Sequence, residues 1–238
     1  MGYQTIFKRY ELKYMISDEQ KNRIIAAMQP YMQLDQYGHS TIRNLYFDTN
    51  TYRLVRRSNE KPVYKEKLRI RSYQQTTAAD TVFVELKKKY QSVVYKRRIA
   101  LPEQEAMNWI VSGVLPRNHT QIAEEIEYFR KCYGKLHPAV FLSYEREAFY
   151  ALDGSDFRVT FDENILARTF DLSLCHEVDG TKLIKNGALM EIKVSAGIPL
   201  WMTKILTDNG LYKTSFSKYG TAYTNLIFNK QGVLQNVG

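Results

Sequence analysis

The stretch Tyr64–Tyr73 (YKEKLRIRSY) carries residues whose types and spacing could bind an anion. In an extended strand every second side chain lies on the same side. One side of this stretch then carries four positive charges: Lys65, Lys67, Arg69 and Arg71. Leu68 and Ile70 lie on the other side. Four like charges at alternate positions repel one another unless an anion lies among them. Because Lys and Arg both bind anions well, the spacing indicates an anion-binding site. The anion could belong to nucleic acid, anionic lipid, a nucleotide or a free phosphate chain.

The same alternation recurs in other segments and often pairs an acidic with a basic side chain. Three segments place a glutamate and a lysine on one face: Glu11 with Lys13, Glu85 with Lys87, and Glu191 with Lys193. For a single strand, a solvated outer face is the ordinary explanation of such a pattern. The recurrence of Lys and Arg over many strands instead favours charged faces that meet in a common interior.

These alternating segments predict about eight strands, a number compatible with a closed barrel. They are Arg9–Tyr14, Thr41–Asp48, Tyr64–Tyr73, Thr81–Lys87, Val94–Ile99, Leu142–Glu147, Phe157–Asp162 and Ala188–Val194. A capping-box signature at Ser17–Gln20 predicts a helix that ends near Pro30. Further helices are expected over residues 103–111, 121–132, 200–207 and 217–228.

The helices carry apolar stripes, so we expect them to cover the outside of the sheet. The charged strand faces would then point inward and line a basic tunnel. We therefore predict an α+β fold with a closed antiparallel β-barrel tunnel and helices packed outside. Because no linker or repeat divides the chain, residues 1–238 are expected to form one domain.

The composition favours a polyanionic partner. The chain has 34 Lys and Arg against 25 Asp and Glu, a net charge of +9. Its 44% hydrophobic residues exclude a disordered basic tail. Cys132 and Cys175 are too few for a disulfide framework, which favours a reducing, cytoplasmic location. No run approaches the roughly 20 apolar residues of a membrane span, so membrane attachment would need a membrane-protein partner.

Seven short motifs together resemble the VTC domain, the polyphosphate polymerase branch of the triphosphate tunnel metalloenzymes. They are Glu11-Leu-Lys13, Leu68-Arg-Ile-Arg71, Glu85-Leu-Lys87, Tyr144-Glu-Arg146, Phe157-Arg-Val-Thr-Phe-Asp162, Met190-Glu-Ile-Lys193 and Phe216-Ser-Lys-Tyr-Gly220. The resemblance covers the chain from about Phe7 to Phe228. It implies an antiparallel β-barrel tunnel that binds triphosphate with a divalent metal, Mn²⁺ or Mg²⁺, and that makes polyphosphate from ATP.

The resemblance also implies roles for individual residues. The expected catalytic, phosphate-binding set is Lys13, Arg69, Arg71, Lys87, Arg146, Arg158 and Lys218. Additional candidate substrate contacts are Lys96, Arg98, Lys193, Ser217, Tyr144, Glu11 and Glu85. Glu191 is the expected metal ligand, and Lys65 and Lys67 are expected nearer the rim. Arg9 stands where hydrolytic members of the superfamily have the first glutamate of an ExExK pattern, which favours a single metal and transfer to phosphate over hydrolysis.

Other side chains are expected to take no part in the chemistry. His39, His119, His137 and His176 are interpreted as surface or packing residues. The cations Arg56, Arg57, Lys88, Lys89 and Arg97 are expected to point outward, into solvent or against anionic lipid or a membrane partner.

Three functions stay open from the sequence. A polymerase would transfer the γ-phosphate of ATP, or of another nucleoside triphosphate, to polyphosphate. A triphosphatase of the same fold would hydrolyse inorganic triphosphate or a nucleoside triphosphate, with water as the acceptor. A non-catalytic module would only bind polyphosphate, and pyrophosphate is a further expected ligand of such a tunnel. Nucleic acid is not an expected partner, because a tunnel is too narrow for a duplex and no RNP-like aromatic motif is present. The chain also lacks the GxxxxGK[ST] motif of P-loop kinases.

Overall fold

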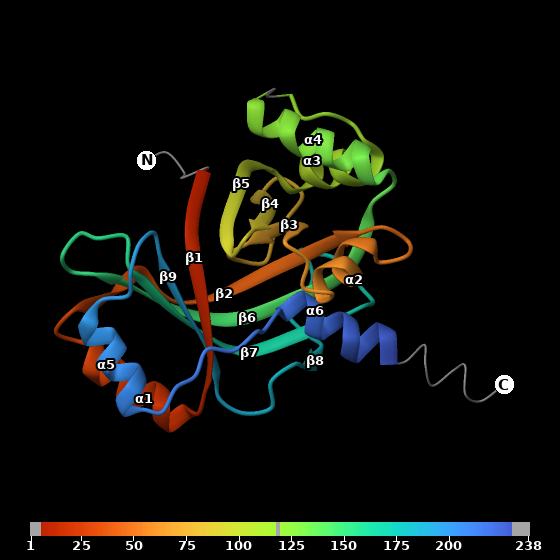
Figure 1. The fold of residues 1–238 in the computed structure, drawn as a ribbon. Coiled ribbons are helices and arrows are strands. Elements are labelled where there is room, and N and C mark those ends of the chain that lie inside the picture. Colours follow the sequence, from red (N-terminus) through yellow and green to blue (C-terminus); the bar gives the residue numbers. More distant parts are fainter. Residues whose placement is uncertain (1–5, 118–119, 230–238) are drawn as a thin grey trace.

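The computed structural model describes residues 6–117 and 120–229, which form strands, α-helices and two short π-helices (Figure 1). The strands are β1 (Ile6–Ile16), β2 (Met32–Asp48), β3 (Tyr64–Ser72), β4 (Thr81–Tyr90), β5 (Val93–Pro102), β6 (His137–Ala151), β7 (Arg158–Arg168), β8 (Thr181–Lys182) and β9 (Ala188–Val194). The helices are α1 (Asp18–Met28), α2 (Arg53–Asn59), α3 (Glu103–Met107), η1 (Asn108–Ser112), α4 (Gln121–Tyr133), α5 (Leu200–Asp208), α6 (Lys218–Tyr223) and η2 (Thr224–Phe228). In the described ranges, no helix combines the length and the hydropathy that crossing a membrane requires.

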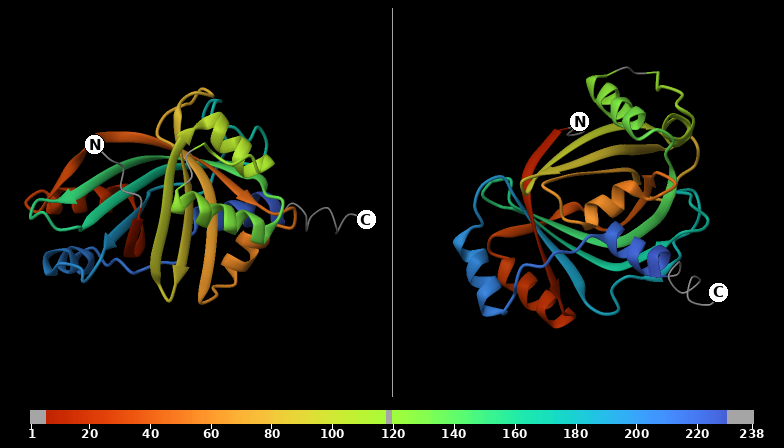
Figure 2. Two further views of the ribbon diagram at one scale, coloured as in Figure 1. Left: turned by 90° about the horizontal axis from the view of Figure 1, so that it is seen from above. Right: turned by 45° about the vertical axis from the view of Figure 1, so that its right-hand side comes forward.

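Eight strands close into an antiparallel ring. They are neighbours in the order β6-β2-β3-β4-β5-β1-β9-β7, and a further pairing between β7 and β6 closes the ring. β8 pairs with β7 outside the ring. Figure 2 shows the strongly twisted strands of this ring from two sides. The predicted α+β fold with a closed antiparallel sheet is therefore confirmed.

The register of the strands brings the charged faces together. Arg69 of β3 lies opposite Glu85 of β4, and Glu85 lies opposite Arg98 of β5. On the other side of β5, β1 places Lys13 opposite Glu191 of β9. Directly opposite residues project from the same face of a sheet. The alternation within each strand thus becomes a shared inner face.

Two apolar clusters cover the outside of the ring. In the first, α3, η1 and α4 pack on β3, β4 and β5, with Trp109 and Leu68 fully buried between them. In the second, α1 and α5 pack on β1, β7 and β9, with Ile24 and Ile192 fully buried. Figure 1 shows these two helical layers at opposite ends of the molecule. They hold the strands from outside, as the apolar stripes predicted.

The C-terminal helix lies against the inner face, and here the sequence-based prediction of an outer helix was wrong. α6 and η2 pack with Leu142 of β6 in a third apolar cluster. Leu142 lies opposite Asn44, which lies opposite Arg71, so Leu142 projects to the inner side. Tyr219 of α6 stacks on Tyr46 with ring centroids 4.6 Å apart. At this end the inward positions are apolar, and they attract the apolar side of α6.

Helix α2 was not predicted from the sequence, and the buried Asp48 explains it. The Asp48 carboxylate accepts hydrogen bonds from the backbone N–H groups of Leu54 (2.9 Å) and Val55 (3.0 Å) in the first turn of α2. It also accepts one from the hydroxyl of Tyr219 at 2.8 Å. One carboxylate at the end of β2 therefore caps α2 and fastens α6 to the ring.

Candidate functional site

A cavity of about 420 Å³ lies inside the ring. Among the described residues, thirteen Lys or Arg side chains line it against two Glu side chains. The cations are Arg9, Lys13, Lys65, Lys67, Arg69, Arg71, Lys87, Lys89, Lys96, Arg146, Lys193, Lys213 and Lys218. The loop between α5 and α6, residues 213–217, also contributes to the lining. Such an excess of positive charge inside low-dielectric walls attracts and holds polyanions.

Glu85 lies fully buried beneath the cavity wall and positions three of these cations. Arg69 Nη2 lies 2.7 Å from its Oε2, Lys96 Nζ lies 3.2 Å from its Oε1, and Arg71 Nε lies 3.8 Å from its Oε2. Burial alone would raise the pKa of Glu85, but Arg71, Arg69 and Lys96 hold it well below its usual range. Glu85 is thus a fixed counter-charge that positions Arg69, Arg71 and Lys96 beside the cavity.

Tyrosine hydroxyls fix the same guanidinium groups from the other side. Arg69 Nη1 donates to the Tyr46 hydroxyl at 3.0 Å, and Arg71 Nη2 donates to the Tyr144 hydroxyl at 2.9 Å. Arg71 Nε also donates to Asn44 Oδ1 at 2.9 Å. Each guanidinium therefore has a set orientation before any ligand arrives, which is the preorganisation that oxyanion binding requires.

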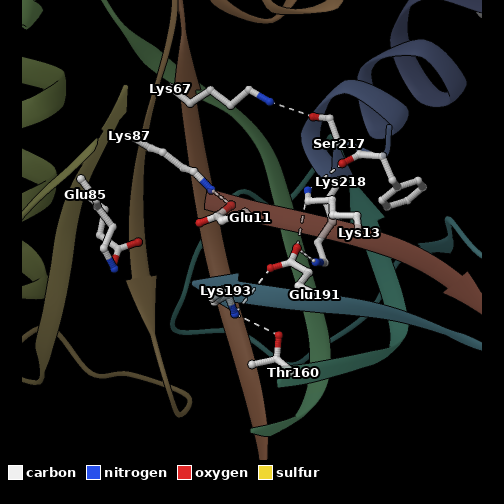
Figure 3. A network of polar contacts seen from close by, with 12 residues as sticks. Glu11, Lys13, Lys67, Glu85, Lys87, Thr160, Glu191, Lys193, Ser217 and Lys218 are labelled. Atoms are coloured by element: carbon white, nitrogen blue, oxygen red, sulfur yellow. Dashed lines mark hydrogen bonds and ion pairs between the residues drawn. The ribbon is translucent and has the colours of Figure 1, made fainter. Parts of the chain in front are cut away.

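Glu191 lies at the centre of a second group of cations (Figure 3). Its carboxylate oxygens lie 3.3 Å from Lys218 Nζ, 3.5 Å from Lys13 Nζ, 3.6 Å from Lys193 Nζ and 3.9 Å from Arg146 Nη2. Burial would raise the pKa of Glu191, but these cations, Lys218 most strongly, hold it well below its usual range. The carboxylate therefore stays ionised at neutral pH.

Asp162 is a further buried carboxylate of the site, and sequence analysis did not assign it a role. It accepts two hydrogen bonds from Arg146, at 2.6 Å from Nε and 2.7 Å from Nη2, and it pairs with Lys218. Burial would lower the pKa of Lys218, but Asp162 and then Glu191 raise it. Asp162 thus holds Arg146 and Lys218 in place from behind the wall.

Two further wall residues, Glu11 and Lys96, have strongly lowered pKa values. Lys87 Nζ donates to Glu11 Oε2 at 2.6 Å. Burial would raise the pKa of Glu11, but Lys87 and other cations lower it to about 2. For Lys96, burial lowers the pKa to about 7, with Glu85 opposing this and with Arg71 and Arg69 adding to it. Lys96 is therefore a wall cation that changes charge near neutral pH.

The structure brings most of the predicted site residues together. Those on the cavity wall are Glu11, Lys13, Arg69, Arg71, Lys87, Lys96, Tyr144, Arg146, Glu191, Lys193, Ser217 and Lys218. Glu85 lies beneath the wall, as described above. Arg98 is not a wall residue, and its guanidinium lies 3.6 Å from the ring centre of Phe83. Arg158 is exposed and lies outside the wall, opposite Lys193 in the register of β7 and β9.

Lys65, Lys67 and Lys89 also line the cavity. Lys89 was expected to point outward, and that prediction was wrong; Lys65 and Lys67, expected nearer the rim, are wall residues too. In the register of β3 and β4, Lys65 lies opposite Lys89 and Lys67 opposite Lys87, so they share the inner face. Loop residues 213–217 meet them there, and this long-range contact is invisible in a local pattern.

The histidines play no part in the wall as far as the structure describes them. His39, His137 and His176 are not among its lining residues. His39 Nδ1 lies 3.5 Å from Glu145, and His176 contacts Asp171. His119 lies outside the described residues.

A divalent metal, which the resemblance implies, fits this site only together with a phosphate ligand. In residues 6–117 and 120–229, no three His, Cys, Asp or Glu side chains come together as a metal site. Glu191 offers one ionised carboxylate on the wall. Mg²⁺ is often bound through one or two carboxylates together with substrate phosphates. The donor set therefore suits a metal that arrives with, and is mostly coordinated by, a phosphate chain.

Comparisons with known proteins agree with this geometry. A family model described as the VTC domain matches residues 8–227. A Bacillus halodurans structure described as a "putative adenylate cyclase" superposes with a TM-score of 0.57 and 16% identity, over 90% of this chain and 96% of that one. At this identity the likeness concerns the fold alone. No match was found among curated protein sequences.

Two further structures align over most of the chain with lower scores. A Vibrio parahaemolyticus protein described in the same words has a TM-score of 0.46 and 12% identity, over 92% of this chain and 98% of its own. The PH1819 protein of Pyrococcus horikoshii has a TM-score of 0.45 and 14% identity, over 94% of this chain and 99% of its own. Nothing in these comparisons points to the membrane-protein partner considered above.

Proposed function

The chain belongs to the VTC domain family, and from this premise we propose that it is an ATP-dependent polyphosphate polymerase. A terminal oxygen of the growing chain attacks the γ-phosphorus of ATP. The bond from that phosphorus to the β,γ-bridging oxygen breaks, and ADP leaves with the bond's electrons. The observation that carries the proposal is the cavity wall, whose thirteen cations against two glutamates suit two phosphate chains brought end to end.

The wall cations do what phosphoryl transfer requires of a protein. The reaction needs in-line positioning and stabilisation of charge on the phosphate oxygens, with little covalent chemistry from side chains. Arg69 and Arg71, held by Glu85 and by tyrosine hydroxyls, offer planar forks to those oxygens. Lys13 and Lys218 supply point charges from the Glu191 side. The two groups face one cavity, so one could hold the donor and the other the acceptor.

The charge state of the wall glutamates favours a phosphate acceptor over water. Attack by water is assisted by a general base, and an efficient base has a pKa near the working pH. Glu11 has a pKa of about 2, and Glu191 has one well below its usual range. A chain phosphate is already an anion and needs no base. Arg9 on the cavity wall, where a glutamate would be a further metal or water ligand, points in the same direction.

A divalent metal would be held by Glu191 and by substrate oxygens. When bound, Mn²⁺ or Mg²⁺ would neutralise part of the charge on the phosphate oxygens. Lys13, Lys193 and Lys218 would keep Glu191 ionised and oriented.

The test is incubation of the purified chain with ATP and Mn²⁺ or Mg²⁺. Products are separated on a gel, and ADP and free phosphate are measured in the same samples. Long chains with matching ADP support the polymerase. Free phosphate without chains would identify a triphosphatase, and neither product, with retained polyphosphate binding, would identify a binding module. Repeating the assay with other nucleoside triphosphates in place of ATP shows which nucleotide is the phosphate donor.

A further inference from the structure

Lys67 differs in its partner from Lys13 and Lys87, the cavity lysines that act on it from other strands. Its Nζ donates a hydrogen bond to the hydroxyl of Ser217 at 2.7 Å (Figure 3). In the described part of the chain, no carboxylate lies within 4.0 Å of this amine. By contrast, Lys87 pairs with Glu11 at 2.6 Å, and Lys13 pairs with Glu191 at 3.5 Å.

Several cations lie around Lys67, on its own strand β3, on the neighbouring strand β4 and on β1. Those that act on it most strongly are Lys13 of β1, Lys87 of β4, and Lys65 and Arg69 of its own strand β3. Burial, together with these four charges, lowers the pKa of Lys67 well below its usual range. A charged lysine in this place raises the energy of the empty cavity, so its presence calls for a reason other than stability.

The Ser217 hydroxyl is a replaceable partner. Its Oγ also accepts the backbone N–H of Gly220 at 3.0 Å, so it is already engaged at the start of α6. The loop before it is held to β1 without Lys67, since Thr214 N–H donates to Lys13 O at 2.8 Å and Lys13 Nζ donates to Phe216 O at 2.6 Å. A phosphate oxygen is a stronger acceptor for an ammonium than a neutral hydroxyl is.

Building on the proposed function, we propose that Lys67 is a further substrate-binding residue, whose Nζ exchanges the Ser217 hydroxyl for a phosphate oxygen when a phosphate chain enters the cavity. The site between Lys67, Lys13 and Lys87 then holds one phosphate group of that chain. The negative charge of the entering phosphate offsets the repulsion among these lysines.

The competing explanation is that Lys67 only tethers the loop through Ser217. The two explanations predict opposite effects of the same substitution. A tether that is removed lowers the melting temperature of the free protein. A cation that is removed from among four others raises it, or leaves it unchanged, while it weakens anion binding.

The experiment measures binding of inorganic tripolyphosphate to the full chain by calorimetry, without metal or nucleotide. The Lys67→Met variant is expected to bind at least about tenfold more weakly than wild type. Lys67→Arg keeps the charge and is expected to stay within a few-fold of wild type. The matched control is Lys88→Met, which removes the same charge from the outer face of β4, where Lys88 lies 3.9 Å from Glu66, and should stay within about twofold of wild type.

Thermal melts without ligand complete the comparison. Weaker binding with an equal or higher melting temperature supports the proposal. Unchanged tripolyphosphate affinity in Lys67→Met would overturn it, and so would a lower melting temperature with unchanged affinity, the result for a tether. If the Met variant does not fold, Lys67→Gln, which keeps a donor towards Ser217 without the charge, is judged by the same criteria.

The proposed polymerase can fail separately: wild type that binds tripolyphosphate but makes no polymer from ATP would reject that function and leave the assignment of Lys67 intact.

Discussion

Arg69 Nη2 lies 2.7 Å from Oε2 of Glu85, and this ion pair joins β3 to β4 directly beneath the cavity. Glu85 is fully buried, while the Arg69 side chain is 14% exposed. The carboxylate side of the pair thus belongs to the protein interior and the guanidinium side to the cavity wall. The same ion pair therefore contributes to stability and positions a cation for the proposed anion binding.

Replacing Glu85 by Gln is expected to destabilise the protein strongly. The change leaves Arg69, Arg71 and Lys96 without their common counter-charge, and breaking a buried ion pair costs about 3–5 kcal/mol. Urea unfolding measures the loss. Added tripolyphosphate should recover part of it, because it binds the folded state and supplies negative charge. As a control, Glu125→Gln removes a partly exposed partner of Arg97 and should cost at most about 1 kcal/mol; equal losses in the two variants would refute the role of Glu85.

Arg69→Ala and Glu191→Gln should each abolish turnover while the fold stays intact. Both residues line the cavity; Arg69 is proposed to bind phosphate oxygens and Glu191 to bind the metal. Loss of one such transition-state contact is expected to lower ADP release at least about 100-fold. Circular dichroism checks the fold. Arg97→Ala is the matched arginine control, because Arg97 pairs with Glu125 of α4 outside the cavity. Near-normal activity of both cavity variants would reject the assignment of the site.

Tripolyphosphate affinity should fall as the pH rises through about 7. Below this value Lys96 is protonated and attracts phosphate; above it the amine becomes neutral, because its pKa in the free protein is about 7. Linkage limits the contribution of this one group to about tenfold in affinity per pH unit. The measurement is a calorimetric titration between pH 6 and pH 9. Lys96→Arg, charged throughout this range, should show a shallower dependence, and an unchanged slope would show that Lys96 is not responsible.

Arg146 and Arg158 should differ in the kinetic constant that they affect. Arg146 lies on the wall, pairs with Asp162 through two hydrogen bonds and lies 3.9 Å from Glu191. Arg146→Ala is therefore expected to lower kcat at least about 100-fold. Arg158 is exposed, so Arg158→Ala should raise KM by a few-fold and leave kcat near wild type. Equal losses of kcat in both variants would place Arg158 at the reacting phosphates.

The local alternation of residues predicted the sheet and most of the cavity wall. Leu68 and Arg69 face opposite sides as their adjacent positions require. Long-range partners were not predictable in the same way. Nothing near Asp162 in the sequence indicates that it holds Lys218, 56 positions away. Similarly, the alternation places Lys67 on the charged face, but its partner Ser217 lies 150 positions later.

The inner position of α6 was missed for a related reason. An apolar stripe shows that a helix must be covered, but not which side of a sheet covers it. Helix α6 packs on the inner side because inward positions such as Leu142 are apolar at the end of the ring where the charged alternation stops. The same end holds Asp48, whose side chain caps a helix that no propensity indicated.

The pairing of the first strand with the last strand of the ring sets the order in which the protein can be made. Residues Ile6–Arg9 of β1 pair with β5, but Tyr10–Ile16 can pair only after β9, which begins at residue 188, has been synthesised. While the ribosome is still synthesising the chain, this length of β1 has an open hydrogen-bonding edge of the kind that favours aggregation. Contacts so distant in sequence also slow folding. A truncated chain that lacks β9 therefore has neither a closed ring nor Glu191, and it exposes an unpaired strand edge that is prone to aggregation.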